Sequence, residues 1–274
     1  MAVINAADVA RLRKVTLAGM MDCKKALEEA EGNFDKAIEI IRKKGQAVAN
    51  KRADRDATEG IVIAKTNGKL GIMTVLNSET DFVAKNADFA GLAGKIADIA
   101  LQNNPINLEA LLTMPLEGTT VAEKVVEFVG IIGEKLELSY YEKVEAEHVQ
   151  VYIHPGSRLA TVVGFSKAGI DEQVYKDVAM QVAAMNPVAV DKDSVPENVI
   201  AQEIEIGREQ ARRDGKSEDM LDKIAQGKLA KFFKESTLLN QEFVKDNKIT
   251  IKQYLQSAHK DLTVTAFKRF TLNL

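Results

Sequence analysis

The fold turns on one stretch of sequence in which a predicted strand ends and a predicted helix begins, Asn77-Ser78-Glu79-Thr80-Asp81-Phe82-Val83-Ala84-Lys85-Asn86. Thr80 and Asp81 are residue types whose side-chain oxygens accept the free N–H groups of a first helical turn. Phe82 follows them at once, which places a large aromatic side chain at the tip of the element. From the residues alone, Phe82 either packs back onto its own helix as a staple or contacts a partner.

The segments around this stretch predict a hairpin followed by a helix. Apolar residues alternate on both sides of Asn67-Gly68, between Ile61 and Val75, which is the pattern of a hairpin with a type I′ turn. From Phe89 to Ala100 the apolar residues recur at helical spacing, and this predicts a helix.

The same order of elements recurs later in the chain. A strand pair is predicted over 149–165, and a helix is predicted to begin at Asp171. We therefore expect an α+β protein whose core consists of two related subdomains, residues 60–144 and residues 145–190 continued by 236–274.

A helical hairpin is predicted to interrupt the second subdomain at 191–235. One helix begins near Pro196, and the segment 214–217 (Asp-Gly-Lys-Ser) supplies a helix end and a new N-cap. Two helices joined by so short a turn form an antiparallel pair. Beyond them, residues 262–272 alternate and are expected to add a strand to the second sheet.

Residues 1–45 predict a module of three short helices. Asp22 is expected to open the second helix, Asn33 to open the third, and Gly45 to end it. Met20-Met21 are placed in the loop before the second helix, where they serve either as core filler or as an adaptable contact surface.

Residues 46–59 predict a solvated linker. The segment has no clear apolar stripe and is rich in charged residues, among them Lys51, Arg52, Asp54, Arg55 and Asp56.

The composition favours an intracellular protein that recognises its partner by specific contacts. The 274 residues have a net charge of −3, which argues against a general grip on nucleic acid. A single cysteine, Cys23, excludes an internal disulfide framework and suits a reducing compartment. With no apolar run long enough to cross a membrane, we expect a soluble, cytoplasmic protein.

No motif for catalysis, metal binding or nucleotide binding is present. The nearest approach to a phosphate-binding loop, residues 130–135, lacks the required spacing and the Ser or Thr. Three histidines and one cysteine form no credible zinc set, and no Ser/His/Asp order indicates a hydrolase. We therefore expect no enzyme activity, cofactor or metal, and an exposed loop position for His154.

Two motifs resemble those of the bacterial elongation factor Ts family. The run Thr80-Asp81-Phe82-Val83-Ala84-Lys85 is similar to one family signature, and residues 12–27, with Leu12-Arg13, Thr16 and Gly19-Met20-Met21-Asp22-Cys23-Lys24-Lys25-Ala26-Leu27, resemble the N-terminal one. The resemblance covers essentially the whole chain. The chain departs from the family pattern at Leu17 and Val75, and we expect it to be a member without the C-terminal helical module that some members carry.

The resemblance implies a guanine-nucleotide exchange factor that binds elongation factor Tu, both GDP-bound and nucleotide-free, and promotes GDP release in translation elongation. It implies that Thr80, Asp81, Phe82 and Val83 wedge near the partner's magnesium and phosphate site, so that Phe82 points outward. It also implies a ubiquitin-associated-like fold for the three-helix module and a coiled-coil insertion. Further implied contacts are Arg13, Met20, Met21, Ile132, Gly133 and His154, with a core position as the alternative for Ile132.

An alternative from another class stays open at this point. The chain would be a non-catalytic holding protein that grips a partner with the three-helix module and the helical hairpin, and Phe82 would serve only the core. The sequence leaves the oligomeric state open as well.

Overall fold

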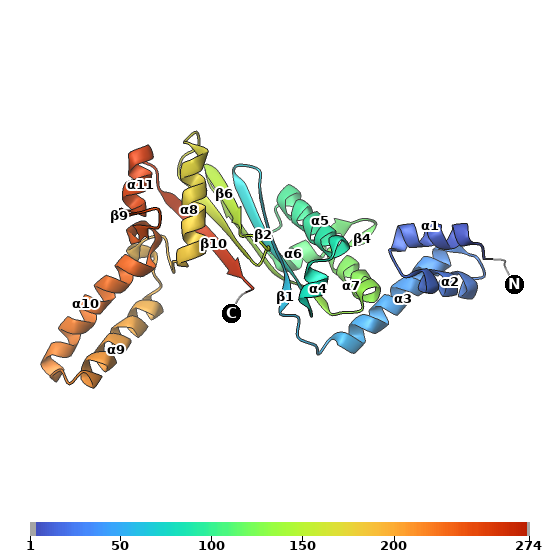
Figure 1. Ribbon diagram of the computed structural model, residues 1–274, viewed down its shortest axis with the longest axis horizontal. Coiled ribbons are helices and arrows are strands. Elements are labelled where there is room, and N and C mark those ends of the chain that lie inside the picture. Colours follow the sequence, from blue (N-terminus) through green and yellow to red (C-terminus); the bar gives the residue numbers. More distant parts are fainter. Residues whose placement is uncertain (1–3, 273–274) are drawn as a thin grey trace. The chain divides into compact units, whose positions relative to one another are not determined.

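The computed structural model describes residues 4–272 and contains both helices and sheets, so the predicted α+β class is confirmed (Figure 1). The chain divides into two compact units, residues 4–63, 74–142 and 272 in the first, and 64–73 and 143–271 in the second. Among these described residues, no helix is both long and apolar enough to cross a membrane. The expected boundaries at 1–45, 46–59, 60–144, 145–190 with 236–274, and 191–235 stay predictions, and residues 1–3 and 273–274 lie outside the described part.

The first unit begins with three helices, α1 (Ala6–Thr16), α2 (Met20–Glu29) and α3 (Phe34–Arg52). Asn33 caps α3 as expected, since its side chain accepts a hydrogen bond from the N–H of Lys36. Their facing sides share one small core, made of Val9, Leu12, Ala18, Cys23, Ala26, Leu27, Ala30 and Ala37.

Two expectations for these helices are wrong. Met20 and Met21 are the first residues of α2 rather than a preceding loop, and Asp22 lies inside that helix. Gly45 does not end α3, which continues to Arg52 and so occupies the first half of the expected linker. The reason is tertiary, because Gly45 is buried against α7 (Val121–Ile132) and this contact outweighs its low helix propensity.

A three-stranded sheet follows, in the order β1 (Glu59–Thr66), β2 (Leu70–Ser78), β5 (Leu136–Glu145). The predicted hairpin of β1 and β2 is present, but its turn is not type I′. A type I′ turn needs a positive φ at both central residues, but only Gly68 has one (φ +98°) and Asn67 does not. The Asn67 side chain accepts hydrogen bonds from the N–H groups of Lys69 and Leu70. The N–H of Asn67 also donates to the carbonyl oxygen of Leu70 at 3.0 Å, so backbone and side-chain bonds of Asn67 together close the turn without two left-handed residues.

The remaining elements of the first unit are α4 (Asp81–Ala84), α5 (Ala87–Asn103), α6 (Leu108–Leu112), the two-stranded pair β3 (Pro115–Leu116) and β4 (Thr119–Thr120), and α7. One face of α5, from Phe89 to Ala100, is buried as its helical spacing predicts.

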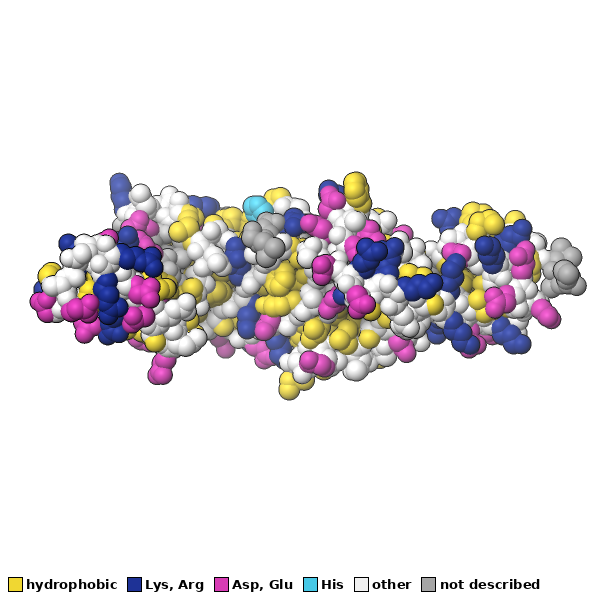
Figure 2. Space-filling view, turned by 90° about the horizontal axis from the view of Figure 1, so that it is seen from below, with side chains coloured by type: hydrophobic (Ala, Val, Ile, Leu, Met, Phe, Trp, Pro, Cys, Tyr) yellow, Lys and Arg dark blue, Asp and Glu magenta, His cyan; other side chains and the backbone are white. Residues whose placement is uncertain are grey.

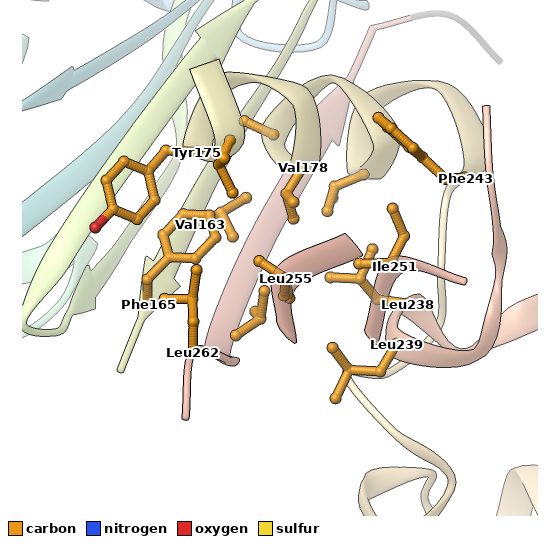
Figure 3. Packing of buried hydrophobic residues seen from close by; sticks show 14 residues of the cluster. Val163, Phe165, Tyr175, Val178, Leu238, Leu239, Phe243, Ile251, Leu255 and Leu262 are labelled. Atoms are coloured by element: carbon orange, nitrogen blue, oxygen red, sulfur yellow. The ribbon is translucent and has the colours of Figure 1, made fainter. Parts of the chain in front are cut away.

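The second unit is built on the antiparallel sheet β10 (Val264–Thr271), β7 (Leu159–Phe165), β6 (His148–Ile153). The predicted C-terminal strand is therefore confirmed as β10. Helix α8 (Glu172–Met185) and helix α11 (Ile251–Ala258) contribute to one core with the sheet. Figure 3 shows Tyr175 and Val178 of α8 with Phe165 of β7 on one side, and Leu255 and Ile251 on the other.

The expected helical hairpin is present as α9 (Glu197–Arg213) and α10 (Glu218–Ser236), which lie side by side (Figure 1). Short elements flank the pair: η1 (Lys192–Ser194), η2 (Leu238–Asn240), β8 (Glu242–Phe243) and β9 (Asp246–Thr250). Leu238 and Leu239, just after α10, belong to the core of the second unit.

Candidate functional site

The side chain of Phe82 stands at the surface of α4, between the end of β2 and the start of α5. It is 80% exposed, and no residue of α4 is buried. The alternative in which Phe82 packs onto its own helix or serves the core is therefore wrong.

Thr80 occupies the N-cap position of α4, but its hydroxyl caps nothing. Instead, the hydroxyl donates to Oε1 of Glu134 at 2.7 Å, and the Thr80 N–H donates to Oε2 at 3.0 Å. Glu134 thus takes both donors of Thr80, which explains why the expected capping bond is missing.

Asp81 is the first residue of α4 rather than its cap. Its Oδ2 accepts a hydrogen bond of 2.6 Å from Nζ of Lys85, one turn along. This bond lowers the pKa of the Asp81 carboxyl below its ordinary value. Asp81 therefore presents a negative charge beside the exposed ring of Phe82 at neutral pH.

Glu79 anchors the turn that leads into α4. Its Oε1 accepts the backbone N–H of Lys135 at 2.6 Å, and Arg52 Nη1 donates to both carboxylate oxygens at 2.9 and 3.0 Å. The hydrogen bond from Lys135, followed by that from Arg52, holds the pKa of Glu79 below its ordinary value although burial raises it.

Ile132 and Gly133 lie beside this turn because they immediately precede Glu134. Ile132 is the last residue of α7, and Gly133 ends the helix with φ +81°. Both are partly buried, so Ile132 is not a fully buried core residue. The structure thus brings Ile132 and Gly133 to the same place as Thr80.

Arg13, Met20 and Met21 are exposed on α1 and α2. The methionines are 56% and 64% exposed, which contradicts the core-filler alternative. Arg13 and Met20 line a shallow depression together with Asp88 in the first turn of α5.

His154 belongs to the second unit, in the loop between β6 and β7. It is exposed as expected, and its Nδ1 lies 2.9 Å from the hydroxyl of Tyr152. Val83 is partly buried, on the same short helix as Phe82.

No cluster within residues 4–272 combines three histidine, cysteine or carboxylate side chains in a way that could hold a metal ion. On the face shown in Figure 2, basic and acidic side chains are interspersed rather than gathered by sign. The exposed groups described above are available for contact with another macromolecule.

The family model described as Elongation factor TS matches residues 79–273 of the chain, beginning at the Glu79 anchor. The chain belongs to the elongation factor Ts family. It is 53% identical to elongation factor Ts of Porphyromonas gingivalis over 267 residues, which cover 97% of each chain. It is also 51% identical to that of Christiangramia forsetii over 276 residues, covering 99% of this chain and all of the relative. The protein of Cytophaga hutchinsonii is 48% identical over 278 residues, the full length of both.

Membership of the elongation factor Ts family implies a nucleotide-exchange factor for elongation factor Tu in translation elongation. Glu79 and Glu134, which organise the site, were not identified from the sequence. Their residue type and spacing assign no role to either glutamate. Thr80 lies 54 positions from Glu134, Lys135 lies 56 positions from Glu79, and Arg52 lies 27 positions from Glu79, so local patterns carry no signal for these bonds.

Proposed function

We propose that the chain binds elongation factor Tu carrying GDP and speeds GDP release, with the tip of α4 disturbing the partner's magnesium and phosphate site. The observation that supports this most directly is the 80% exposure of Phe82 at the end of a short helix. A large aromatic left in water gains free energy when a partner buries it, and aromatic side chains are frequent anchors of protein interfaces.

The proposed mechanism uses the two neighbouring side chains differently. Phe82 supplies apolar contact, and Asp81 brings an ionised carboxylate close to it. Magnesium demands near-ideal octahedral geometry, so a small displacement of its ligands weakens its hold on the nucleotide. Reciprocity of binding free energies then requires that GDP weakens the grip of the exchange factor by the same factor, which allows turnover.

The remaining predicted contacts complete the proposed interface. Thr80 and Val83 flank the tip, and Ile132 and Gly133 lie beside it. Arg13, Met20 and Met21 would contact the partner from α1 and α2, and His154 from the second unit. We also propose that α1 to α3 form a ubiquitin-associated-like module, that the core comprises two related subdomains, and that α9 and α10 are an inserted arm.

The test compares Phe82→Ala with Ile106→Ala in an assay of GDP release from purified elongation factor Tu. Ile106 is a matched control because it is 82% exposed and also belongs to the first unit. We expect Phe82→Ala to lower the stimulated release rate by about tenfold or more, the scale of an interface hot spot. We expect Ile106→Ala to leave the rate unchanged.

The holding-protein alternative predicts another outcome in the same assay. If the protein binds elongation factor Tu but does not accelerate GDP release, exchange is not its function. Unchanged release by Phe82→Ala would remove the α4 tip from the mechanism.

A further inference from the structure

Glu79 and Glu134 form a reciprocal pair across two turns of the first unit. Glu79 accepts the N–H of Lys135, the residue after Glu134, and Glu134 accepts the N–H of Thr80, the residue after Glu79. The Thr80 hydroxyl adds a third bond to Glu134. The turn from β2 into α4 and the turn from α7 into β5 therefore hold each other through carboxylate bonds to backbone N–H groups, which are stronger than bonds between neutral groups.

The end of α3 joins the same junction. Arg52, its last residue, donates to both oxygens of Glu79, and Nζ of Lys135 donates to the carbonyl oxygen of Ala53 at 3.1 Å. Glu79 and Lys135 are therefore each bonded on two sides, whereas the two oxygens of Glu134 both serve Thr80. Of these residues, Glu134 is the one whose side-chain bonds both go to Thr80, at the start of α4.

Helix α4 has little else to hold it in place. It has four residues and no buried side chain, and its first backbone bonds are long, with Ala84 N–H to Thr80 O at 3.3 Å and Lys85 N–H to Asp81 O at 3.2 Å. A helix of one turn is not stable by itself in water, and packing is what normally keeps a short helix folded. Apart from the partial burial of Val83 and Ala84, the orientation of α4 therefore comes from its two ends.

We propose that Glu134 is a positioning residue for exchange: by holding both donors of Thr80 it fixes the start of α4 and so the direction in which Phe82 points. This inference rests on the proposed function, because it assigns Glu134 an effect on GDP release that passes through the α4 tip. A tip that rotates freely must be ordered when the partner binds, and small errors in placement are expensive for a group that acts by geometry.

The chemistry of the bonds allows graded variants. Glu134→Ala removes both acceptors. Glu134→Gln keeps a carbonyl oxygen for the Thr80 N–H, and its NH₂ group can donate to the Thr80 hydroxyl, which also accepts hydrogen bonds. Thr80→Val removes the hydroxyl and keeps the N–H. Glu109→Ala is the control, since Glu109 is an exposed carboxylate on α6 of the same unit.

The decisive experiment is a double-mutant cycle in the GDP-release assay with purified elongation factor Tu. We expect Glu134→Ala to lower the maximal stimulated rate by about tenfold, with Glu134→Gln restoring most of it and Glu109→Ala without effect. In a Phe82→Ala background, Glu134→Ala should lower the rate by a clearly smaller factor, because the main group that it positions is gone and only Asp81 remains. Additive losses would overturn the proposal, since Glu134 would then act on the partner by itself.

Hydrogen exchange of the free protein gives a readout that does not depend on exchange activity. Glu134→Ala should speed exchange at the amide of Thr80 and at those of α4, and leave the buried amides of α5 protected. Unchanged hydrogen exchange at the Thr80 amide would show that Glu134 does not hold Thr80 in place. Faster exchange there with normal GDP release overturns the positioning role.

The two proposals fail in different ways. If Phe82→Ala releases GDP at the normal rate, the proposed function fails whatever Glu134 does. If Phe82→Ala is impaired and Glu134→Ala is normal, only the positioning role fails. If Glu134→Ala does not fold, Thr80→Val replaces it in the same double-mutant cycle. An unchanged rate of GDP release by Thr80→Val would then count against a positioning role for the bonds between Glu134 and Thr80.

Discussion

Gly45 of α3 and Gly130 of α7 face each other with their backbones in direct contact, and the contact is asymmetric. A Cβ added at Gly130 would overlap the Cα of Gly45. A Cβ added at Gly45 would lie 3.5 Å from the carbonyl oxygen of Val126 and 3.6 Å from the Cα of Gly130, which are ordinary contact distances. The packing of α3 on α7 (Figure 1) therefore depends on glycine at one position more than at the other.

We expect Gly130→Ala to destabilise the first unit by about 1–3 kcal/mol, because two helix backbones must move apart to admit the methyl group. Gly45→Ala meets no such obstacle and gains helix propensity, so it should be neutral or stabilising by up to ~1 kcal/mol. Urea unfolding of both variants measures the difference.

Gly91→Ala is the control for this comparison. Gly91 lies inside α5 with no atom within 4 Å of its added Cβ, so alanine there should stabilise by about 0.5–1 kcal/mol. Equal effects of alanine at Gly45 and Gly130 would contradict the asymmetry.

Gly45 shows which features of the fold cannot be predicted from the sequence. A glycine near the end of an apolar pattern is typical of a helix C-terminus, and Gly32 does end a helix turn with φ +83°. Gly45 carries the same local pattern for a different reason, since its partner Gly130 lies on a helix far along the chain. Local periodicity predicted α5 and α8 because each buries one face, whereas a close approach of two backbones leaves no periodic trace.

The sequence likewise predicts one part of the candidate site and misses another. Thr80 was placed correctly at a helix start, because its residue type is typical of one. Its hydrogen bonds go to Glu134 instead of to α4, and a carboxylate 54 positions away cannot be identified from one sequence. Only the resemblance predicts the exposure of Phe82, since the residues alone favour a staple for an aromatic that follows a cap.

Asp177 of α8 joins three segments of the second unit through hydrogen bonds to its buried carboxylate. It is 5% exposed, and it accepts hydrogen bonds from Gln173 at 2.6 Å, from Lys245 at 2.7 Å and from Tyr254 at 2.9 Å. We expect Asp177→Ala to destabilise this unit by about 1–3 kcal/mol, because it removes three hydrogen bonds to a buried charged group and leaves the partly buried hydroxyl of Tyr254 without its acceptor. Lys245 is half exposed and can turn to water, which keeps the loss in that range.

Glu172→Ala on the same helix provides the control in urea unfolding. Its carboxylate is 62% exposed and pairs with Lys176 at 3.9 Å, so its removal should change stability by less than about 0.5 kcal/mol. If the two variants lost similar amounts of stability, the hydrogen bonds of Asp177 would not hold the three segments together.

The depressed pKa of Glu79 predicts a pH dependence of a stated sign. Between the lower pKa of the folded protein and the ordinary value, the unfolded chain binds a proton that the folded protein does not, so stability rises with pH. The stabilisation is fully present above the ordinary glutamate value and is lost as pH falls through the folded pKa. Urea unfolding from about pH 6 to about pH 3 should show the stability difference between the wild type and Glu79→Gln shrinking. A constant difference would contradict the assignment.

The helical pair α9 and α10 is expected to be dispensable for the fold of the second unit. The chain enters and leaves it at one place, because Ala189 and Thr237 form a parallel bridge and the N–H of Val188 donates to the carbonyl oxygen of Ser236 at 2.8 Å. The pair also has a seam of its own, where Gly207 meets Ala225.

We therefore expect replacement of residues 197–235 by a short Gly/Ser linker to leave a folded protein. The retained residues include Leu238 and Leu239, which belong to the core (Figure 3). Joining two neighbouring segments by a shorter loop lowers the entropy cost of closure, so the stability of the remaining unit should change by no more than ~1 kcal/mol. The urea m-value should fall, since less surface becomes exposed on unfolding. Hydrogen exchange at the buried amides of β7 measures the outcome directly: protection equal to that of the full chain is expected, and its collapse would show that the pair is part of the core.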